Sequence, residues 1–350
     1  MSDCHFLVPG ALERPTGGSR YDREIVRGLR QQGLAVAVSE LPGRFPQGDE
    51  TARAAINAAL EPLPDQATVV VDGLVLGGLP EIFARHARRL RLHALIHHPL
   101  SDESGIDAAL ARRLLDRETE AVAQARCVIT TSGFTAHRLR ELGIHQGAVE
   151  VIEPGCSPRP LATGSRDGVP TLLCVAALSP RKAQHVLLDA LWRIADRRWH
   201  CRLAGPVDLD PPYAAAVHEQ RDALGLAGRV EITGALDAER LDAAYRTADL
   251  FVLPSRYEGY GMVINEAMAY GLPVLTTTGG ALATTLPADA GLAVAPDDTT
   301  ALADALQRLL DDHALRQSLV EGAQRARRRL AGWTPAIQRF MALLDRGNDA

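Results

Sequence analysis

Residues 250–274, LFVLPSRYEGYGMVINEAMAYGLPV, predict a buried strand, a tight loop and a helix in direct succession. Leu250–Leu253 is a short apolar run without charge, which suits a strand covered on both faces of a sheet. We expect a helix from near Gly261 to just before Gly271, with Pro273 as a second stop signal. The loop between strand and helix therefore lies at the carboxyl edge of an open α/β sheet, where such folds bind ligands.

This loop and the helix after it carry two carboxylates, Glu258 and Glu266, eight residues apart. Eight helical residues rise about 12 Å, more than the ~5–10 Å that separates the acid and base of a glycosidase. We therefore interpret the two side chains as two separate hydrogen-bonding contacts to one polyhydroxylated ligand, because each carboxylate can accept hydrogen bonds from two hydroxyls. The alternative for Glu266 is a solvated helix residue. The loop glycines let the backbone approach a ligand closely, and the first helical turn favours an anion.

Composition limits the protein to a few classes. Its 350 residues, 46% of them hydrophobic, suffice for two ordinary domain cores. No apolar run reaches the ~20 residues that span a bilayer, and the first residues do not resemble a signal peptide, so we expect a cytoplasmic protein. Five scattered cysteines without metal-binding spacing fit a reducing compartment. The net charge of −5 argues against general nucleic-acid binding.

The first half alternates short apolar runs with helical patterns, which predicts a parallel sheet covered by helices. We expect its strands at residues 6–8, 34–38, 69–71, 92–96, 127–129 and 149–152. A turn-rich loop with Gly17 and Gly18 follows the first strand, although a glycine pair is a weak signal by itself. His97 and His98 follow the fourth strand, and we expect one of them to enter a site because adjacent side chains on extended backbone face opposite sides. The helix expected at residues 81–92 carries several arginines, which we interpret as a solvated face, with a membrane-surface or acidic-partner patch as the alternative.

The alternation restarts after residues 154–170, whose four prolines and three glycines predict an interdomain linker. We expect the strands of the second half at residues 171–176, 201–204, 230–232, 250–253 and 274–276. Arg181 and Lys182 lie in the loop after the first of these strands, just before a helix, where a basic pair would clamp a phosphate. Lys182 is the only lysine among 38 basic residues, which indicates a specific use for its compact ammonium.

The motif P-S-x-x-E-G-Y-G-x4-E-A-x-A-x-G-x-P-V at residues 254–274 strongly resembles that of family-4 retaining glycosyltransferases. The resemblance continues through residues 179–190, 230–253 and 279–296, so it covers the second half well and the first half sketchily. It implies an α/β fold of GT-B architecture, with two Rossmann-like α/β/α domains facing a central cleft.

The resemblance also implies an order of domains along the chain. Residues 1–155 would be the acceptor-side domain, 156–170 the linker and 171–332 the nucleotide-sugar donor domain. The segment 333–350 would pack back toward the first domain.

The family's donor contacts transfer to residues of the central motif by position. Glu258 is similar to the residue that holds donor-sugar hydroxyls. The backbone amides of Gly259, Tyr260 and Gly261 resemble the contacts to the sugar and the diphosphate. Glu266 is similar to the glutamate that binds the ribose.

Further contacts transfer from outside the motif. Lys182 is similar to the basic residue on the diphosphate, and backbone near Leu236 resembles the nucleobase contact. In the first half, Gly17 and Gly18 resemble the family's glycine loop. His97 is similar to the histidine whose backbone or side chain touches the transferred sugar.

The sequence departs from the family pattern at three places. Ala176-Ala177 stands where the family has Gly-Arg, so one diphosphate cation is missing, and Arg181 is the candidate substitute. Ala183 replaces a glycine that usually follows the lysine, and the glutamate after the Gly279-Gly280 pair is absent.

The chemistry that the resemblance implies is transfer of a hexosyl group, with retention, from a UDP- or GDP-linked sugar to an acceptor hydroxyl. His97, Lys182 and Glu258 would be the catalytic residues, and we expect no cofactor and no metal because the sequence has no Asp-x-Asp motif or His/Cys cluster. The acceptor would be a small molecule or a lipid-linked one, with membrane contact at most peripheral. Two alternatives remain: a nucleotide-sugar epimerase of the same fold, or a donor-binding protein without turnover.

Overall fold

The structure is a computed structural model that describes residues 3–346, and these residues form two compact units. One unit combines the chain up to Gly155 with the segment from Trp333 onward, and the other is Cys156–Gly332. Each unit contains a six-stranded sheet in which every strand pair is parallel. Two parallel sheets covered by helices confirm the predicted α/β fold class.

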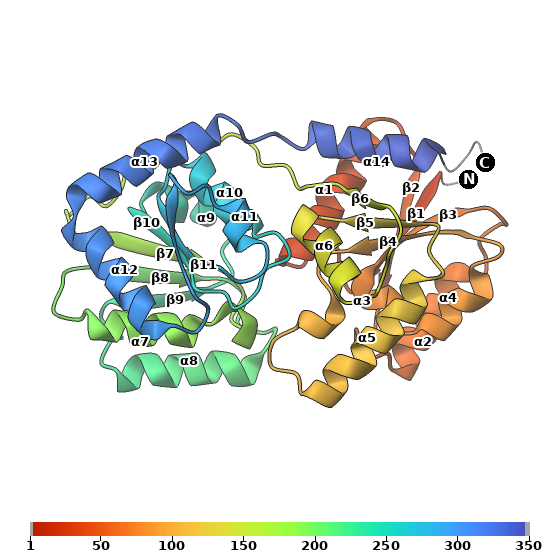
Figure 1. Ribbon diagram of the computed structural model, residues 1–350, viewed down its shortest axis with the longest axis horizontal. Helices are drawn as coiled ribbons and strands as arrows, with labels where there is room; N and C mark the ends of the chain where they lie inside the picture. Colours follow the sequence, from red (N-terminus) through yellow and green to blue (C-terminus); the bar gives the residue numbers. More distant parts are fainter. Residues whose placement is uncertain (1–2, 347–350) are drawn as a thin grey trace. The chain divides into compact units, whose positions relative to one another are not determined.

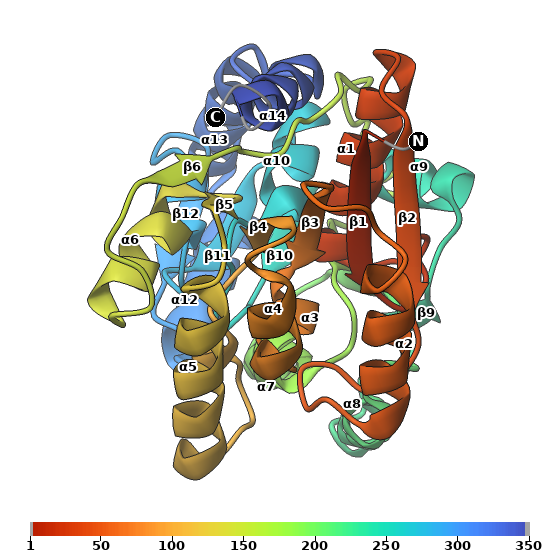
Figure 2. The ribbon, with the colours of Figure 1, turned by 90° about the vertical axis from the view of Figure 1, so that its right-hand side faces the viewer.

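The sheet of the first unit has the strand order β2-β1-β3-β4-β5-β6. Its strands are β1 (Cys4–Pro9), β2 (Val36–Leu41), β3 (Thr68–Asp72), β4 (Arg91–Ile96), β5 (Cys127–Thr130) and β6 (Val149–Val151). One face packs against α2 (Glu50–Leu60), α3 (Gly73–Leu76), α4 (Pro80–His86), α5 (Ala108–Val122) and α6 (Gly133–Glu141) (Figure 2). The opposite face is covered by α1 (Gly17–Gln31) and α14 (Thr334–Arg346) (Figure 1).

The sheet of the second unit has the strand order β12-β11-β10-β7-β8-β9. Its strands are β7 (Thr171–Val175), β8 (His200–Ala204), β9 (Val230–Gly234), β10 (Leu250–Leu253), β11 (Val274–Thr277) and β12 (Gly291–Val294). One face holds α7 (Gln184–Arg193), α8 (Pro211–Ala223) and α12 (Thr299–Asp311). The other face holds α9 (Ala238–Arg246), α10 (Met262–Ala269) and α11 (Leu282–Thr285), and α13 (His313–Arg327) contacts both α10 and α12 (Figure 1).

Residues 250–274 fold as their sequence pattern predicts. All four residues of β10 are buried between its neighbours β11 and β7, and α10 follows after the loop. A strand in the middle of a parallel sheet is covered on both faces, which explains why β10 is apolar without alternation. The predicted site loop therefore follows a central strand of the sheet.

The prediction of a helix at residues 81–92 is wrong in two respects: the helix is shorter, and one of its arginines is not on a solvated face. Helix α4 ends at His86, and Arg91 already belongs to β4. Arg89, expected on a solvated face, donates hydrogen bonds to the carbonyls of Leu60 (2.7 Å) and Leu63 instead. The guanidinium thus satisfies carbonyl groups at the end of α2, which helical periodicity does not reveal.

The segment 156–170, predicted as a linker, belongs to the second unit. The amide of Ala162 donates to the carbonyl of Tyr270 (2.8 Å), and the amide of Thr163 donates to that of Arg246 (2.8 Å). This extended backbone is not part of a β-sheet, and its amides are hydrogen-bonded to carbonyls at the ends of α9 and α10. Among the described residues, no helix combines the length and the hydropathy that crossing a bilayer requires.

The last helix, α14, packs on the first unit. Phe340 is fully buried, and its ring lies 5.8 Å from that of Phe6 on β1. Trp333, just before the helix, makes an edge contact with Tyr21 on α1 at 5.7 Å. These aromatic contacts make the C-terminal segment part of the first unit's core.

Phe340→Ala should destabilise the first unit by about 3–5 kcal/mol, because it removes a fully buried aromatic ring and leaves a cavity. Urea unfolding monitored by circular dichroism measures the change. The exposed Gln338 lies on the same helix, so Gln338→Ala is the matched control and should change the free energy of unfolding by less than about 0.5 kcal/mol. Equal effects of the two substitutions would contradict the packing described.

Candidate functional site

The loop before α10 has the shape that a close ligand contact requires. Gly261 is the N-cap of α10 with φ 88°, and a Cβ there would lie 2.8 Å from Leu282 Cδ2. Glycine is the residue that adopts this left-handed conformation without strain. Tyr260 is fixed on both sides, because Asn265 donates to its hydroxyl (2.8 Å) and Thr285 donates to its carbonyl (2.6 Å). The 259–261 backbone is therefore ordered at the N-terminus of α10.

Glu258 is the centre of a buried charge cluster. Its Oε1 accepts hydrogen bonds from Lys182 Nζ (2.5 Å) and from the hydroxyl of Ser255 (2.7 Å). Its Oε2 lies 3.4 Å from Arg181 Nη1. We name Glu258, Lys182, Arg181 and Ser255 the carboxylate cluster. It joins two loops whose partners are 76 residues apart in the chain.

The charge state of this cluster follows from its contacts. Burial of Glu258 would raise the pKa of its carboxyl, but the charges of Lys182 and Arg181 and the hydrogen bonds from Lys182 and Ser255 lower that pKa below its ordinary value. Glu258 is therefore a carboxylate in the folded chain. Its oxygens already accept three protein donors, so the two open acceptor oxygens expected from the sequence are not what the structure shows.

The basic pair Arg181-Lys182 lies in a short 3₁₀ turn, Pro180–Lys182, that leads into α7. Ala183 follows with φ 52° and ψ 40°, the left-handed region. A residue with a Cβ costs about 1–2 kcal/mol there, which explains why the family resemblance expects glycine at this position. The departure at Ala183 therefore carries backbone strain and leaves the turn in place.

Arg256, which the sequence did not single out, fastens this basic turn. Its amide donates to the carbonyl of Arg181 (2.8 Å), and its Nη1 donates to the carbonyl of Pro180 (3.3 Å). Its Nε pairs with Asp297 Oδ1 at 2.7 Å. Arg256 therefore connects the loop after β10 to the loop after β7.

Two glycines let the chain pass close to Glu258. A Cβ on Gly280, which has φ 65°, would overlap the carbonyl oxygen of Glu258, and one on Gly279 would overlap that of Arg256. The amide of Ala281 donates to the carbonyl of Glu258 (2.8 Å). The glycine pair therefore positions the backbone that carries the carboxylate cluster.

Glu266 lies on α10 and is buried, which excludes the solvated alternative. Its Oε2 accepts a hydrogen bond from the hydroxyl of Tyr245 on α9 (3.1 Å). The ring of Tyr245 stacks on Tyr270 with centroids 4.8 Å apart. Glu258 and Glu266 thus have different hydrogen-bond partners, which is compatible with two separate contacts to a ligand. Leu236 lies in the loop after β9 and is partly buried against the same core.

The first unit brings a second set of polar residues together, and two of them were missed from the sequence. His97 Nε2 lies 3.2 Å from Asp22 Oδ1 and 3.4 Å from Asp72 Oδ2. We name Asp22, His97 and Asp72 the Asp-His-Asp triad. Asp22 is on α1 and Asp72 ends β3, where its Oδ1 also accepts from the amide of Leu74 (2.7 Å). The position of Asp72 at the end of a strand could have indicated a site residue. Asp22 lies inside a helix, and its position in the sequence indicates no role.

The predicted glycine loop lies beside this triad. Gly17 and Gly18 are the first residues of α1, and a Cβ on Gly18 would lie 3.3 Å from the ring of His97. His98 faces elsewhere and pairs with Glu103 at 3.3 Å, so one of the two histidines joins the triad. The three ligand-type atoms of the triad lie within 4.8 Å of one another, a spacing that a metal ion can also bridge. The Nε2 atom is hydrogen-bonded to Asp22 and also lies within ion-pair distance of Asp72.

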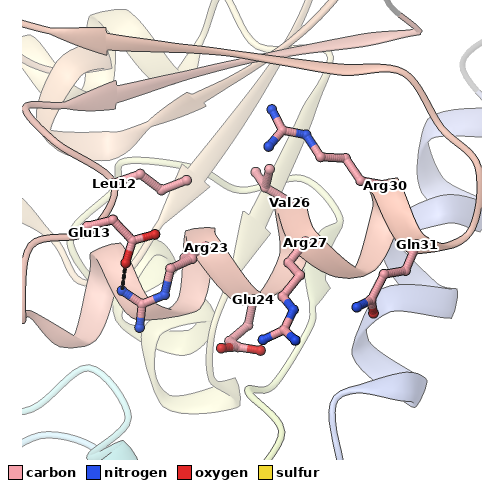
Figure 3. Close-up of a pocket in the computed structure, with 8 residues that line it drawn as sticks. All are labelled: Leu12, Glu13, Arg23, Glu24, Val26, Arg27, Arg30 and Gln31. Atoms are coloured by element: carbon pink, nitrogen blue, oxygen red, sulfur yellow. Dashed lines mark hydrogen bonds and ion pairs between the residues drawn. The ribbon is translucent and has the colours of Figure 1, made fainter. Parts of the chain in front are cut away.

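A cavity of about 560 Å³ lies along α1 and the loop before it (Figure 3). Its lining residues are Leu12, Glu13, Arg23, Glu24, Val26, Arg27, Arg30 and Gln31. Arg23 pairs with Glu13 at 3.2 Å, and Arg30 donates to the carbonyl of Val36. No predicted site residue lines this cavity, so we do not assign the site to it.

Comparison with known families decides the nature of the second unit. A family model described as glycosyl transferases group 1 matches residues 169–312. The second unit carries a glycosyltransferase domain. The carboxylate cluster, Leu236 and Glu266 all lie within this glycosyltransferase domain, and the triad lies outside it.

Curated relatives agree with this assignment. The D-inositol 3-phosphate glycosyltransferase of Nocardia farcinica is 32% identical over 212 residues, 56% of this chain and 47% of that protein. The GDP-mannose-dependent alpha-(1-6)-phosphatidylinositol monomannoside mannosyltransferase of Mycolicibacterium smegmatis is 32% identical over 207 residues, 54% of each chain. The matches span about half the length of these curated relatives.

Solved structures extend the likeness in fold to the whole chain. Sucrose-phosphate synthase from Thermosynechococcus elongatus superposes with a TM-score of 0.82 at 22% identity, over 98% of both chains. Anabaena Alr3699/HepE in complex with UDP and glucose gives a TM-score of 0.75 at 19% identity, over 99% of this chain and 100% of that one. These likenesses confirm the GT-B fold class.

Gly280→Ala should destabilise the glycosyltransferase domain by about 2–4 kcal/mol, because a methyl group at positive φ would meet the backbone of Glu258. Thermal and urea unfolding measure the effect. Gly228 has open space around it and no positive φ, so Gly228→Ala is the control and should leave stability nearly unchanged. A stable Gly280→Ala variant with an undisturbed Glu258 segment would show that this close approach is not required.

Proposed function

We propose that the protein is a retaining glycosyltransferase that moves a hexosyl group from a nucleotide-diphosphate sugar to an acceptor hydroxyl. The observation that carries the proposal is the carboxylate cluster beside the ordered 259–261 loop, inside a matched glycosyltransferase domain. The cluster supplies cations and the N-terminus of α10 supplies backbone amides, and both stabilise a diphosphate. The named relatives are transferases or a synthase, which favours this function over an epimerase or a binding-only protein.

In this proposal each part of the donor is bound by different residues. Lys182 and Arg181 stabilise the diphosphate as it leaves, and Glu258 orients both cations while one acceptor position of its Oε2 serves the sugar hydroxyls. Glu266 binds the ribose, the 259–261 amides contact sugar and diphosphate, and backbone near Leu236 contacts the nucleobase. With Ala177 uncharged, Arg181 provides the second cation, since its guanidinium already lies in the cluster.

The first unit supplies the acceptor side in this proposal, and Gly17, Gly18 and His97 are its substrate-contacting residues. The acceptor hydroxyl attacks the anomeric carbon on the face from which the diphosphate departs, and the departing diphosphate takes the hydroxyl proton. Retention therefore needs no enzyme nucleophile. Positioning and charge stabilisation then provide the rate enhancement. Turnover proceeds without a divalent ion, on a UDP- or GDP-linked donor and a small-molecule or lipid-linked acceptor.

A donor screen tests the proposed function. Thermal shift with UDP- and GDP-sugars selects the nucleotide, and mass spectrometry of reactions with sugar and lipid-linked acceptors detects the product. Proton NMR of the product then reads the anomeric configuration, which should match that of the donor. Turnover that stops with a chelator and returns only with Mg²⁺ or Mn²⁺ would contradict metal independence. Product formed without an acceptor would indicate epimerisation.

Lys182→Ala should lower kcat by about 100- to 1000-fold, because it removes a preorganised cation from the leaving group, a loss of ~3–4 kcal/mol. Steady-state kinetics at saturating donor measure the effect, and thermal unfolding checks that the domain is intact. Arg193 is an exposed cation on α7, the next helix, so Arg193→Ala is the control and should retain full activity. A Lys182→Ala enzyme within threefold of wild type would make Arg181 the residue to test.

Glu266→Gln should weaken donor binding about 10- to 150-fold while the fold is preserved, because a charged hydrogen bond worth ~1.5–3 kcal/mol is lost. The amide can still accept from Tyr245, so the core contact is retained. Calorimetric titration with the donor measures the affinity, and Glu239→Gln, an exposed acid on α9, is the control. Unchanged affinity in Glu266→Gln would remove Glu266 from the site.

A further inference from the structure

Each of the three nitrogens of the Arg256 guanidinium has a partner in the second unit. Its Nε lies 2.7 and 3.0 Å from the two carboxylate oxygens of Asp297, and its Nη1 donates to the carbonyl of Pro180 at 3.3 Å. Its Nη2 lies 3.3 Å from Nε2 of His185. A guanidinium carries its donors in a rigid planar fork, so the three partners together determine where this group lies.

His185 is held in one tautomer by its contact with Arg256, because an arginine only donates hydrogen bonds. Nε2 of the ring is therefore the acceptor, and the ring proton is on Nδ1. This Nδ1–H donates to the hydroxyl oxygen of Tyr213 on α8 (2.8 Å), which also accepts from the His185 amide (3.3 Å). Burial and then the charge of Arg256 lower the pKa of His185, which favours the neutral ring. The acids Asp297 and Asp189 act in the opposite direction and do not reverse this shift.

Asp297 presents its carboxylate to Arg256 from a strained backbone. Its φ is 60°, in the left-handed region, where glycine is unstrained and a residue with a Cβ is less stable. The side chain is 50% exposed, and ion pairs in contact with solvent contribute little to the stability of a fold. A glycine at position 297 would therefore suit the backbone better, and the contact with Arg256 is what the aspartate adds.

The contacts of Arg256 lead to the basic turn, Pro180–Lys182. Arg256 binds two successive carbonyls of this turn, that of Pro180 through its side chain and that of Arg181 through its amide (2.8 Å). The next residue, Ala183, has φ 52°, and such a strained residue keeps its conformation only where the surrounding structure holds it. The position of Arg256 thus sets the position of the backbone that carries both cations of the carboxylate cluster.

We propose that Arg256, His185 and Asp297 are positioning residues of the donor site, which hold the basic turn so that its two cations face the diphosphate of the nucleotide sugar. In this arrangement Asp297 contributes to donor binding and not to the stability of the fold. The three side chains act through the turn and do not themselves contact the diphosphate. The inference rests on the proposed function for the identity of the ligand. The order of the turn is a property of the ligand-free chain, so the two can fail separately.

Substitutions at Asp297 separate a positioning role from a structural one. Asp297→Gly relieves the backbone strain and removes the carboxylate, so the melting temperature should stay equal or rise. The donor Kd should nevertheless increase about 10-fold, less than the ~100-fold loss that a 1 Å misplacement can cause. Asp297→Asn keeps an oxygen acceptor for Arg256 and is tolerated at positive φ, so it should bind the donor more tightly than Asp297→Gly. Thermal unfolding and calorimetric titration with UDP- or GDP-sugar measure the two quantities.

Arg256→Lys tests the geometry of the guanidinium at constant charge. A compact ammonium cannot replace a planar fork with three partners, so donor binding should weaken about 10-fold. The basic turn of the ligand-free chain should also become less ordered, which hydrogen–deuterium exchange measures as faster exchange in peptides that cover residues 179–184. Arg325 is an exposed arginine that binds one carboxylate oxygen of Asp289 at 3.1 and 3.0 Å, so Arg325→Lys is the matched control and should change neither quantity.

Nitrogen-15 NMR of the ligand-free chain reads the tautomer of His185 directly. The His185 signals are assigned by their loss in His185→Gln. At neutral pH they should show a proton on Nδ1 and none on Nε2, because Nε2 accepts from Arg256. A proton on Nε2 would show that Arg256 does not bind this ring and would remove His185 from the proposal.

Several other outcomes would overturn the proposal. Unchanged or tighter donor binding in Asp297→Gly would show that the ion pair does not position the turn, and a melting temperature that falls together with the affinity would show a structural role. Exchange at residues 179–184 that is as slow in Arg256→Lys as in the wild type would show that the turn does not depend on Arg256. If Arg256→Lys does not fold, Asp297→Gly and the wild-type NMR spectrum decide the question.

Failure of the proposed function has a different signature. If the wild type binds no nucleotide sugar, the proposed function is refuted together with the donor part of this inference. The exchange and NMR measurements use the ligand-free chain, so they still decide whether Arg256, His185 and Asp297 hold the turn.

Discussion

The ion pair between Glu258 and Lys182 is the contact on which the site of the second unit depends. It joins the loop after β10 to the turn after β7, and Arg181 and Ser255 complete its hydrogen bonds. If Lys182 is removed, Arg181 and Ser255 remain as hydrogen-bond partners of Glu258, so we expect the loss of the ion pair to impair the site more than the fold. Neighbouring residues support this pair. Gly279 and Gly280 leave room for the backbone around Glu258, and Arg256 is hydrogen-bonded to the turn that carries Lys182.

Much of this arrangement was predictable because parallel sheets have simple rules. The apolar run Leu250–Leu253, the glycine at 261 and the stop before Gly271 specify a strand, loop and helix from local chemistry alone. Strand ends of a parallel sheet share one edge, so Lys182 and Glu258 were expected near one ligand. The resemblance to glycosyltransferases, confirmed by the family match, gave these residues their expected roles.

Other features depend on tertiary contacts that no local pattern encodes. Asp22 meets His97 across 75 residues of sequence, and its side chain looks like an ordinary helix residue until the fold is known. Arg89 lies in an arginine-rich run, but its bonds to the end of α2 take it out of the solvated face. Short elements such as β12 and α3 are too brief for a periodic signal. The engagement of Glu258 by three donors likewise follows from packing.

Hydrogen–deuterium exchange with and without UDP- or GDP-sugar tests whether the carboxylate cluster and the N-terminus of α10 form the donor site. We expect slower exchange on donor binding in peptides that cover residues 179–184 and 255–266, with little change in the peptides of α2 and α8. Protection confined to other parts of the chain, or donor binding without protection of these two segments, would contradict a donor site at the carboxylate cluster.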